Sequence, residues 1–191
     1  MDTKKLRISL GVAALLLAGA AAAQAPERGR FADLYVGGAV GKSHAKQICN
    51  NVADCDDTDN SFGAFAGYWF NRNFAAEVGY QNLGSVTAPG GTYVRSNVWE
   101  AVGVAAWHFH EPFSLYGKLG VYRGGQEGGG ALASPRERMS DVTYGAGLQV
   151  DLPRGLGVRV EWQNYARLGG GPTLPAGDIR DLRLAALWRF Q

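Results

Sequence analysis

The stretch GAFAGYWFNRNFAAEVGYQNLG, residues 63–84, indicates two β-strands joined by a tight turn. Before the turn, Phe65 and Trp69 would lie on one face of a strand, and Tyr68 on the other. Residues 71–73, Asn-Arg-Asn, suit a sharp reversal because asparagine tolerates a left-handed backbone. Alternation with a period of two on both sides of a short turn predicts an antiparallel hairpin.

The same period of two recurs along the rest of the chain and predicts an all-β fold with eight strands. The 191 residues include 28 glycines, 8 tyrosines, 8 phenylalanines and 5 tryptophans, and helical periodicities are few. The predicted strands are residues 34–45, 61–70, 74–83, 96–109, 113–123, 140–151, 156–165 and 179–190.

The predicted connections alternate between long loops and short turns. Long loops follow the first, third, fifth and seventh strands, whereas short turns at residues 71–73, 110–112 and 152–155 follow the second, fourth and sixth. Transmembrane β-barrels have this arrangement, with the short turns in the periplasm. An even strand number then places both termini on the periplasmic side. The alternative, a soluble β-sandwich, predicts no such alternation.

Strand length and aromatic residues favour the membrane barrel over the sandwich. Several predicted strands have about ten or more residues, which is enough to cross a bilayer at a tilt. Aromatic residues near the predicted short-turn ends fit an interfacial girdle. These residues are Tyr68, Phe70, Tyr80, Trp107, Phe109, Trp188 and Phe190.

The N-terminal sequence predicts export. Basic residues precede an apolar stretch at 8–18, and Ala21-Ala22-Ala23 fits the small-residue cleavage pattern of a signal peptide. A membrane anchor is the alternative, but the apolar stretch is shorter than the ~20 residues that span a bilayer. We therefore expect a signal peptide at 1–23, a short lead-in at 24–33 and an outer-membrane barrel domain at 34–191.

Six segments resemble the OmpA-like eight-stranded transmembrane barrel family, in the same order over nearly the whole mature chain. They are LYVGGAVGKS, GAFAGYWFNRNFAAEVGYQNLG, LYGKLGVYR, GAGLQVDL, GVRVEWQNY and LRLAALWRF. The resemblance implies an integral outer-membrane protein. It also implies an interior ion-pair cluster that is proposed to act as a gate, with Glu77, Arg159 and Glu161 at matching positions. Gln149 stands where the family can carry a glutamate, and the fourth strand lacks the family's basic partner, which argues against a switching gate.

Polar residues on the predicted interior face form a candidate network. Charges in a barrel core are costly unless they are paired, and side chains fill an eight-stranded barrel. We therefore expect a static polar plug that includes a Glu77–Arg159 pair, with inward aromatic rings obstructing flow. The network residues are Glu77, Glu100, Lys118, Gln149, Arg159, Glu161 and Arg183, and the rings are those of Tyr35, Phe65, Trp69, Tyr116 and Tyr122.

Both cysteines, Cys49 and Cys55, fall in the first predicted loop, which would face the oxidising exterior. Their spacing is longer than C-x-x-C, and two cysteines with the single His44 make a poor zinc site. We therefore predict a disulfide, and no metal or cofactor. The nearby aspartates do not match an EF-hand; a weak surface cation site, or cation-bridged lipopolysaccharide, is the alternative to a solvated acidic loop.

The sequence favours a structural or surface-interaction protein over two alternatives, a small gated pore and a lipid-modifying enzyme. An enzyme of the second kind needs a nucleophile beside a base; Ser43 and His44 are adjacent and so point to opposite faces of a strand. The mature chain is near neutral, because the net charge of +2 includes three signal-peptide basic residues, and no nucleic-acid partner is expected. The expected partners are outer-membrane lipids and lipopolysaccharide, with host, phage or envelope proteins as candidates for the external loops.

Overall fold

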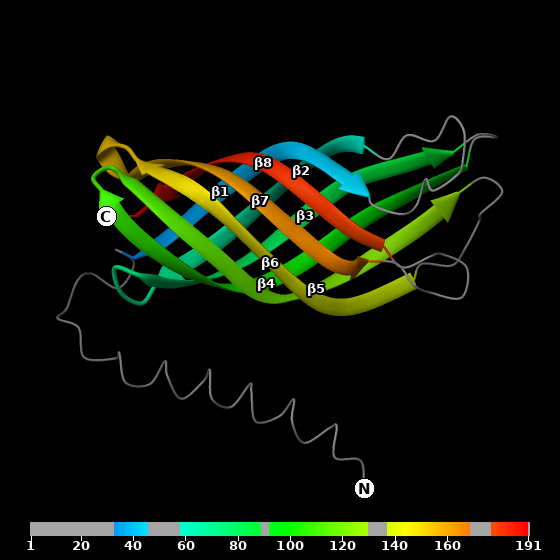
Figure 1. Cartoon of the computed structure of the whole chain (residues 1–191), viewed down its shortest axis with the longest axis horizontal. Coiled ribbons are helices and arrows are strands. Elements are labelled where there is room, and N and C mark those ends of the chain that lie inside the picture. The colour runs from blue at the N-terminus through cyan, green and yellow to red at the C-terminus, as the bar shows by residue number, and fades with distance from the viewer. Residues whose placement is uncertain (1–32, 46–57, 89–91, 130–136, 169–176, 191) are drawn as a thin grey trace, which may run out of the picture.

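The computed structural model describes residues 33–45, 58–88, 92–129, 137–168 and 177–190, which form a barrel of antiparallel strands (Figure 1). A short 3-10 turn, η2 (Pro153–Gly155), precedes the seventh strand. The strands are β1 (Leu34–Ala45), β2 (Thr58–Trp69), β3 (Phe74–Ala88), β4 (Thr92–His110), β5 (Phe113–Gly129), β6 (Glu137–Asp151), β7 (Leu156–Leu168) and β8 (Gly177–Arg189).

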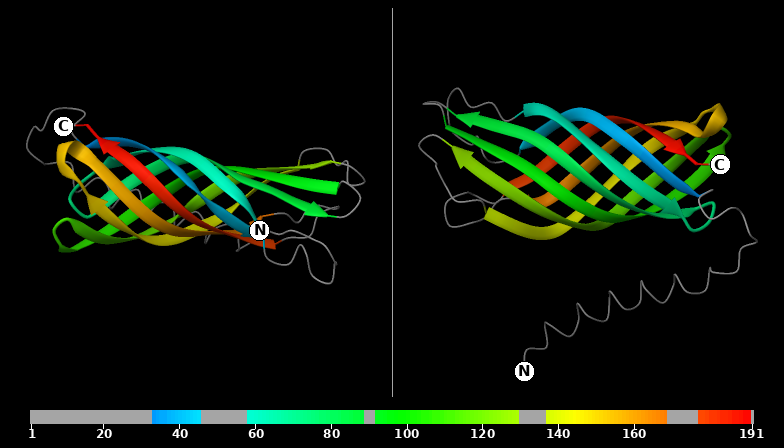
Figure 2. Two further views of the ribbon diagram at one scale, coloured as in Figure 1. Left: turned by 90° about the horizontal axis from the view of Figure 1, so that it is seen from above. Right: turned by 180° about the vertical axis from the view of Figure 1, so that it is seen from behind.

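The strands pair in chain order, and the barrel closes between its first and last strands. In this closing pair, Val40 of β1 lies opposite Leu184 of β8. The N–H of Phe190 donates to the carbonyl of Leu34 at 2.9 Å. The start of the first strand and the end of the last strand therefore both lie at the short-turn end of the barrel. Figure 2 shows the closed cylinder from two further sides. The predicted eight-stranded all-β barrel is confirmed.

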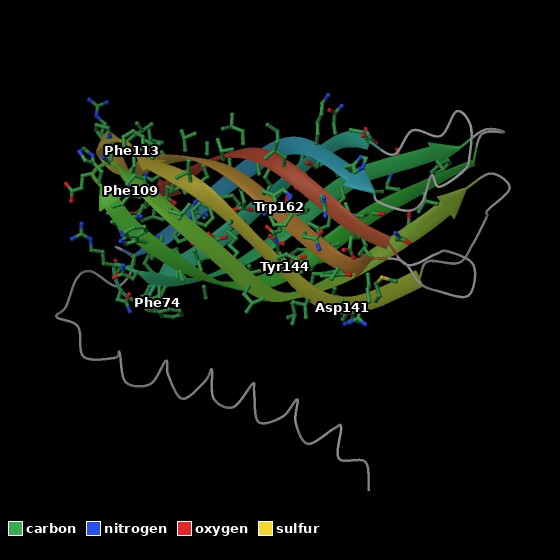
Figure 3. All side chains as sticks on the ribbon, viewed as in Figure 1. Phe74, Phe109, Phe113, Asp141, Tyr144 and Trp162 are labelled. Atoms are coloured by element: carbon green, nitrogen blue, oxygen red, sulfur yellow. The ribbon has the colours of Figure 1, made fainter. Side chains whose placement is uncertain are left out.

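The barrel surface is apolar, whereas charged side chains are buried in its interior together with apolar and aromatic ones, which is the reverse of how a water-soluble protein places its charges. On β7, Val160 and Trp162 are exposed, whereas Arg159 and Glu161 are buried. The outward side chains surround the barrel along its length (Figure 3). So large an apolar exterior is stable where lipid rather than water surrounds it.

Local sequence explains the turn between β2 and β3. The Asn71 Oδ1 atom accepts the backbone N–H groups of Asn73 and Phe74 at 2.8 and 2.9 Å. The Asn73 side chain donates to the carbonyl of Ala106 at 2.9 Å, which ties the turn to β4. Asparagine side chains that bond the backbone two residues on are a common way to close a turn.

Exposed aromatic rings gather at the short-turn end, as the girdle interpretation requires. The rings of Tyr68 and Phe70 are 5.6 Å apart, and those of Trp107 and Phe109 are 6.1 Å apart. The placement of Tyr80 in this girdle is wrong. Tyr80 lies opposite Trp99 in the neighbouring strand, farther from the turn, and their ring centres are 5.1 Å apart.

Three neighbouring strands extend beyond the rest of the barrel at the loop end (Figures 1 and 2). β3, β4 and β5 contain 15, 19 and 17 residues, whereas β1 and β2 contain 12 each. The long loop predicted after the third strand is therefore wrong. β3 bulges between Asn82 and Ser85, with Gly84 at a φ of +77°, and then pairs with β4 as far as Ala88. The bulge interrupts the period-two pattern, and this hid the rest of the strand.

Several predictions concern residues outside the described ranges. These are the signal peptide at 1–23, all but the last residue of the lead-in at 24–33, and the Cys49–Cys55 disulfide. They stay predictions.

Within the described ranges, no helix has the length and apolar character needed to cross a membrane.

Candidate functional site

All seven predicted interior residues point into the barrel lumen and are buried. Their exposed fractions run from 1% for Arg159 to 6% for Glu100. Hydrogen bonds and ion pairs join them in one network, which has a part nearer the short turns and a part nearer the loops. The contributing residues are Glu77 on β3, Glu100 on β4, Lys118 on β5, Gln149 on β6, Arg159 and Glu161 on β7, and Arg183 on β8.

The part nearer the turns, here called the turn-side quartet, consists of Glu77, Lys118, Arg159 and Glu161. Lys118 Nζ lies 2.6 Å from one carboxylate oxygen of Glu77 and 2.6 Å from one of Glu161. Arg159 Nη1 contacts the other oxygen of Glu77, and its Nε donates to Gln149 Oε1 at 2.6 Å. The quartet has two acids and two bases, so each buried charge has an opposite partner.

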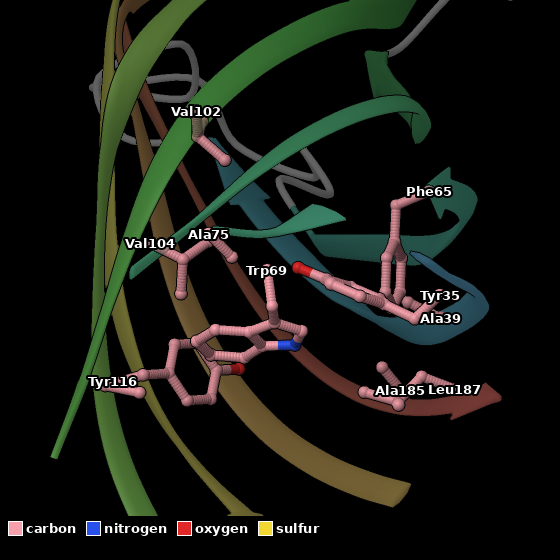
Figure 4. Packing of buried hydrophobic residues seen from close by; sticks show 11 residues of the cluster. Tyr35, Ala39, Phe65, Trp69, Ala75, Val102, Val104, Tyr116, Ala185 and Leu187 are labelled. Carbon is pink, nitrogen blue, oxygen red and sulfur yellow. The ribbon is translucent and has the colours of Figure 1, made fainter. Parts of the chain in front are cut away.

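Aromatic rings enclose the quartet. The Arg159 guanidinium lies 5.3 Å from the ring centre of Tyr35 and 5.0 Å from that of Tyr116. Tyr35 donates its hydroxyl to Glu77 at 2.6 Å, and Tyr116 donates to Glu161 at 2.7 Å. Figure 4 shows these two tyrosines packed with Phe65, Trp69 and smaller apolar side chains. The rings thus supply both hydrogen bonds and cation–π contacts to the charges.

Glycines make room for the inward rings. Gly67 lies opposite Tyr35 across β1 and β2, and a Cβ at this position would collide with the tyrosine ring. Gly147 has the same relation to Tyr116 across β5 and β6. Each ring therefore lies over the glycine of the neighbouring strand.

The part nearer the loops, here called the loop-side cluster, consists of Glu100, Asp181 and Arg183. Arg183 connects it to the quartet, since its Nε donates to Glu161 Oε1 at 2.7 Å. Arg183 Nη2 lies 3.4 Å from Glu100 Oε1, and Nη1 lies 3.6 Å from Asp181 Oδ2. One arginine thus faces carboxylates from three strands.

Neutral side chains complete the loop-side cluster. Gln163 and Tyr165 both donate to Glu100 Oε2, at 2.7 and 2.8 Å. Ser61 donates to Asp181 Oδ1 at 2.6 Å. Sequence reasoning omitted Asp181 from the network, although its parity on the eighth strand matched that of Arg183. That parity is the signal that could have found it.

Exposed arginines lie toward the loop end of β4, β5 and β6. Arg95, Arg123 and Arg138, here called the rim arginines, are all exposed. Arg123 on β5 lies opposite Trp99 of β4. Arg138 on β6 lies opposite Gly125, two residues along from Arg123 on the same face of β5. This places two of the arginines diagonally across one strand pair.

The described residues contain no group of three or more His, Cys, Asp or Glu side chains that could hold a metal ion. Ser43 donates to the carbonyl of Leu83, and the His44 ring lies 3.3 Å from Thr58 Oγ1. These two neighbours therefore have different partners, as their opposite parities predict.

A closed ring of strands with an apolar exterior and a paired, charged interior defines an integral membrane β-barrel. Residues 12–190 match the model of the family described as outer membrane protein beta-barrel domain, and the chain belongs to this family. The predicted location in the outer membrane is thereby confirmed. No curated protein sequence matches the chain.

Solved structures with the same fold are outer-membrane barrels. The attachment invasion locus protein Ail of Yersinia pestis has a TM-score of 0.58 at 17% identity, over 83% of this chain and 99% of Ail. Neisserial surface protein A has a TM-score of 0.61 at 14% identity, over 82% and 97%. The N-terminal barrel domain of Pseudomonas aeruginosa OprF has a TM-score of 0.56 at 13% identity, over 83% and 98%. At these identities the similarity establishes the fold.

Proposed function

We propose that this outer-membrane barrel is a closed structural body that recognises anionic ligands at the cell surface. The observation that carries the proposal is the filled lumen, where buried ion pairs and aromatic rings join strands all around the barrel. A plugged interior directs function to the outer surface. Function depends on the chemistry of such a site rather than on the fold.

The extended strands offer the recognition surface. They project past the barrel at the loop end and carry Arg95 and Arg123 on their outer face, with Arg138 on the adjacent strand. Arginine binds sulfate and phosphate groups well because its planar fork can donate two hydrogen bonds to one anion. Sulfated glycans and the phosphates of lipopolysaccharide are therefore the ligand classes that this surface suits.

A structural neighbour supports a surface role of this kind. One structure of Ail contains the heparin analogue sucrose octasulfate, with a TM-score of 0.55 at 16% identity to this chain, over 83% of this chain and 99% of Ail. The present chain has its own exposed basic residues at the loop end, Arg95, Arg123 and Arg138, which support the anionic class of ligand.

The test is binding of the mature protein, refolded into lipid nanodiscs, to immobilised heparin. We expect salt-sensitive binding that is lost when Arg95, Arg123 and Arg138 are all replaced by glutamine. In the control variant, glutamine replaces Arg72 and Arg154, which are exposed at the opposite, short-turn end. This variant should bind heparin like the wild type. No binding by the wild type, or equal loss in the control, contradicts the proposal.

A small gated pore is the second candidate, and one contact favours it. Lys118 lies equally close to Glu77 and Glu161, so a shift toward either carboxylate would rearrange the plug. Planar-bilayer recording separates the two candidates. A closed body gives no discrete conductance steps, with folding confirmed by a heat-dependent gel shift. Reproducible steps that change in Lys118→Gln would favour the pore.

We further propose that the protein is not an enzyme. The separate partners of Ser43 and His44 support this, since a nucleophile needs a base within hydrogen-bond reach. Comparing the lipid A acyl pattern of cells with and without the protein tests the point, and a pattern that depends on it would contradict us.

A further inference from the structure

The buried charges of the lumen are unequal in number. Among the described residues that are buried, four are acids and three are bases. The turn-side quartet has two of each, so the excess negative charge belongs to the loop-side cluster, where Arg183 faces both Glu100 and Asp181. The four acids are Glu77, Glu100, Glu161 and Asp181, and the three bases are Lys118, Arg159 and Arg183.

An excess charge in this position requires a partner. An uncompensated ion in a low-dielectric interior is strongly unfavourable, and removing one member of a buried pair costs several kcal/mol for this reason in proteins generally (about 3–5). The three side chains of the loop-side cluster are buried in this way, with exposed fractions of 6% or less. A further positive charge would restore neutrality.

Hydrogen bonding identifies Asp181 as the acceptor of this charge. Glu100 is well supplied, because its Oε2 accepts bonds from Gln163 and Tyr165. Asp181 is fully buried, and its Oδ1 accepts a bond from Ser61. Its Oδ2 has no hydrogen-bond partner among the described residues, because Arg183 Nη1, at 3.6 Å, is beyond hydrogen-bond length.

The groups that face Asp181 supply little further positive charge. Arg183 is the base on its own strand, and β4 presents Glu100 across the lumen. β7 presents Gln163 directly opposite, with Glu161 and Tyr165 on either side of it. β1 contributes Ser43 directly opposite, and β2 contributes Ser61 with Asp59 farther toward the loops. Gln81 of β3 lies over Gly63, two residues from Ser61 on the same face, and both its Oε1 and its Nε2 lack a hydrogen-bond partner among the described residues.

We propose that the loop-side cluster is a binding site for one small monovalent cation, which Asp181 accepts. The single excess charge sets the charge of the ligand, and the buried position restricts its size to that of a proton or an alkali metal ion. Asp181 lies four positions after Gly177, the first residue of β8; Ile179, between them on the same face, and Ala45 opposite it are buried. The site does not depend on surface recognition by the rim arginines.

The test measures the urea unfolding equilibrium of the mature protein in detergent micelles at constant ionic strength. One series varies pH, and a second replaces sodium by N-methylglucamine at fixed pH. Since the native state would bind the cation and the unfolded state would not, wild-type stability should fall relative to Asp181→Asn as pH rises or as sodium is removed. One linked ion changes the unfolding equilibrium constant by up to about tenfold per tenfold change in its concentration.

Two further variants make the result decisive. Asp141→Asn removes a loop-side carboxylate that pairs with Arg167 on the surface, and it should retain the wild-type dependence. Glu100→Gln removes the same excess charge as Asp181→Asn and should abolish the dependence even if Asp181→Asn does not fold. Dependence on pH alone identifies a proton, and dependence on sodium identifies an alkali ion. No dependence in the wild type, or dependence that persists in both buried-site variants, overturns the proposal.

Discussion

The turn-side quartet and the loop-side cluster are both built from buried acids and bases, yet their net charge differs. Lys118 and Arg159 neutralise Glu77 and Glu161 at contact distance. Arg183, in contrast, lies 3.4 Å from Glu100 and 3.6 Å from Asp181, so no base among the described residues is within hydrogen-bond length of Asp181 Oδ2. A barrel interior can therefore combine a neutral part that stabilises the fold with a charged part that is open to a ligand.

The largest effect is expected where the neutral quartet is broken. Arg159→Ala leaves the buried Glu77 carboxylate without its arginine and should lower the free energy of unfolding by about 3–5 kcal/mol. Urea unfolding of the barrel in micelles measures this change. An unchanged midpoint would contradict a stabilising role for the quartet.

The two regions should differ in how much stability they lose when one carboxylate charge is removed. At neutral pH, Glu77→Gln leaves the quartet with two bases, Lys118 and Arg159, and one acid. The variant should therefore be destabilised by about 3 kcal/mol. Asp181→Asn removes the excess charge and should change the free energy of unfolding by less than about 1 kcal/mol. Equal losses in the two variants would remove the distinction between the regions.

A smaller effect is expected from crowding the aromatic rings around the quartet. Gly67→Ala forces Tyr35 away from its place and should destabilise the barrel by about 1–3 kcal/mol. Gly103→Ala is the matched control, because a Cβ there would meet its nearest atom, the Leu119 carbonyl oxygen, at 3.7 Å. Thermal unfolding of both variants gives the comparison, and equal stability would contradict close packing at Gly67.

The smallest effect is expected for an ion pair outside the lumen. Arg72 and Glu111 are 3.2 Å apart on the short-turn surface, and both side chains are largely exposed. Arg72→Ala should cost less than about 1 kcal/mol, since water screens such pairs. A loss as large as that of Arg159→Ala would show that burial is not what separates the two arginines.

Much of the fold could be predicted because strand parity is a local property. The first strand was predicted with the observed bounds, and the inward placement of Tyr35 and Arg159 followed from the alternation alone. The continuation of β3 past Gly84 could not be predicted in this way, because a bulge shifts the parity. The role of Asp59 in that bulge, where it accepts the Ser85 N–H at 2.6 Å, depends on residues 26 positions apart.

The sequence by itself determined the eight-stranded barrel, its polar interior and the identity of most lumen residues. These features depend on a period of two and on the residues of short turns, both of which are written locally along the chain. The Glu77–Arg159 pair was also predicted, and the structure shows it. The other pairings were decided only by the tertiary structure, because partners such as Glu100 of β4 and Arg183 of β8 are far apart in the sequence and meet across the closed barrel. Whether the lumen charges cancel is likewise a property of the closed barrel, and it is there that Asp181 acquires its unsatisfied oxygen.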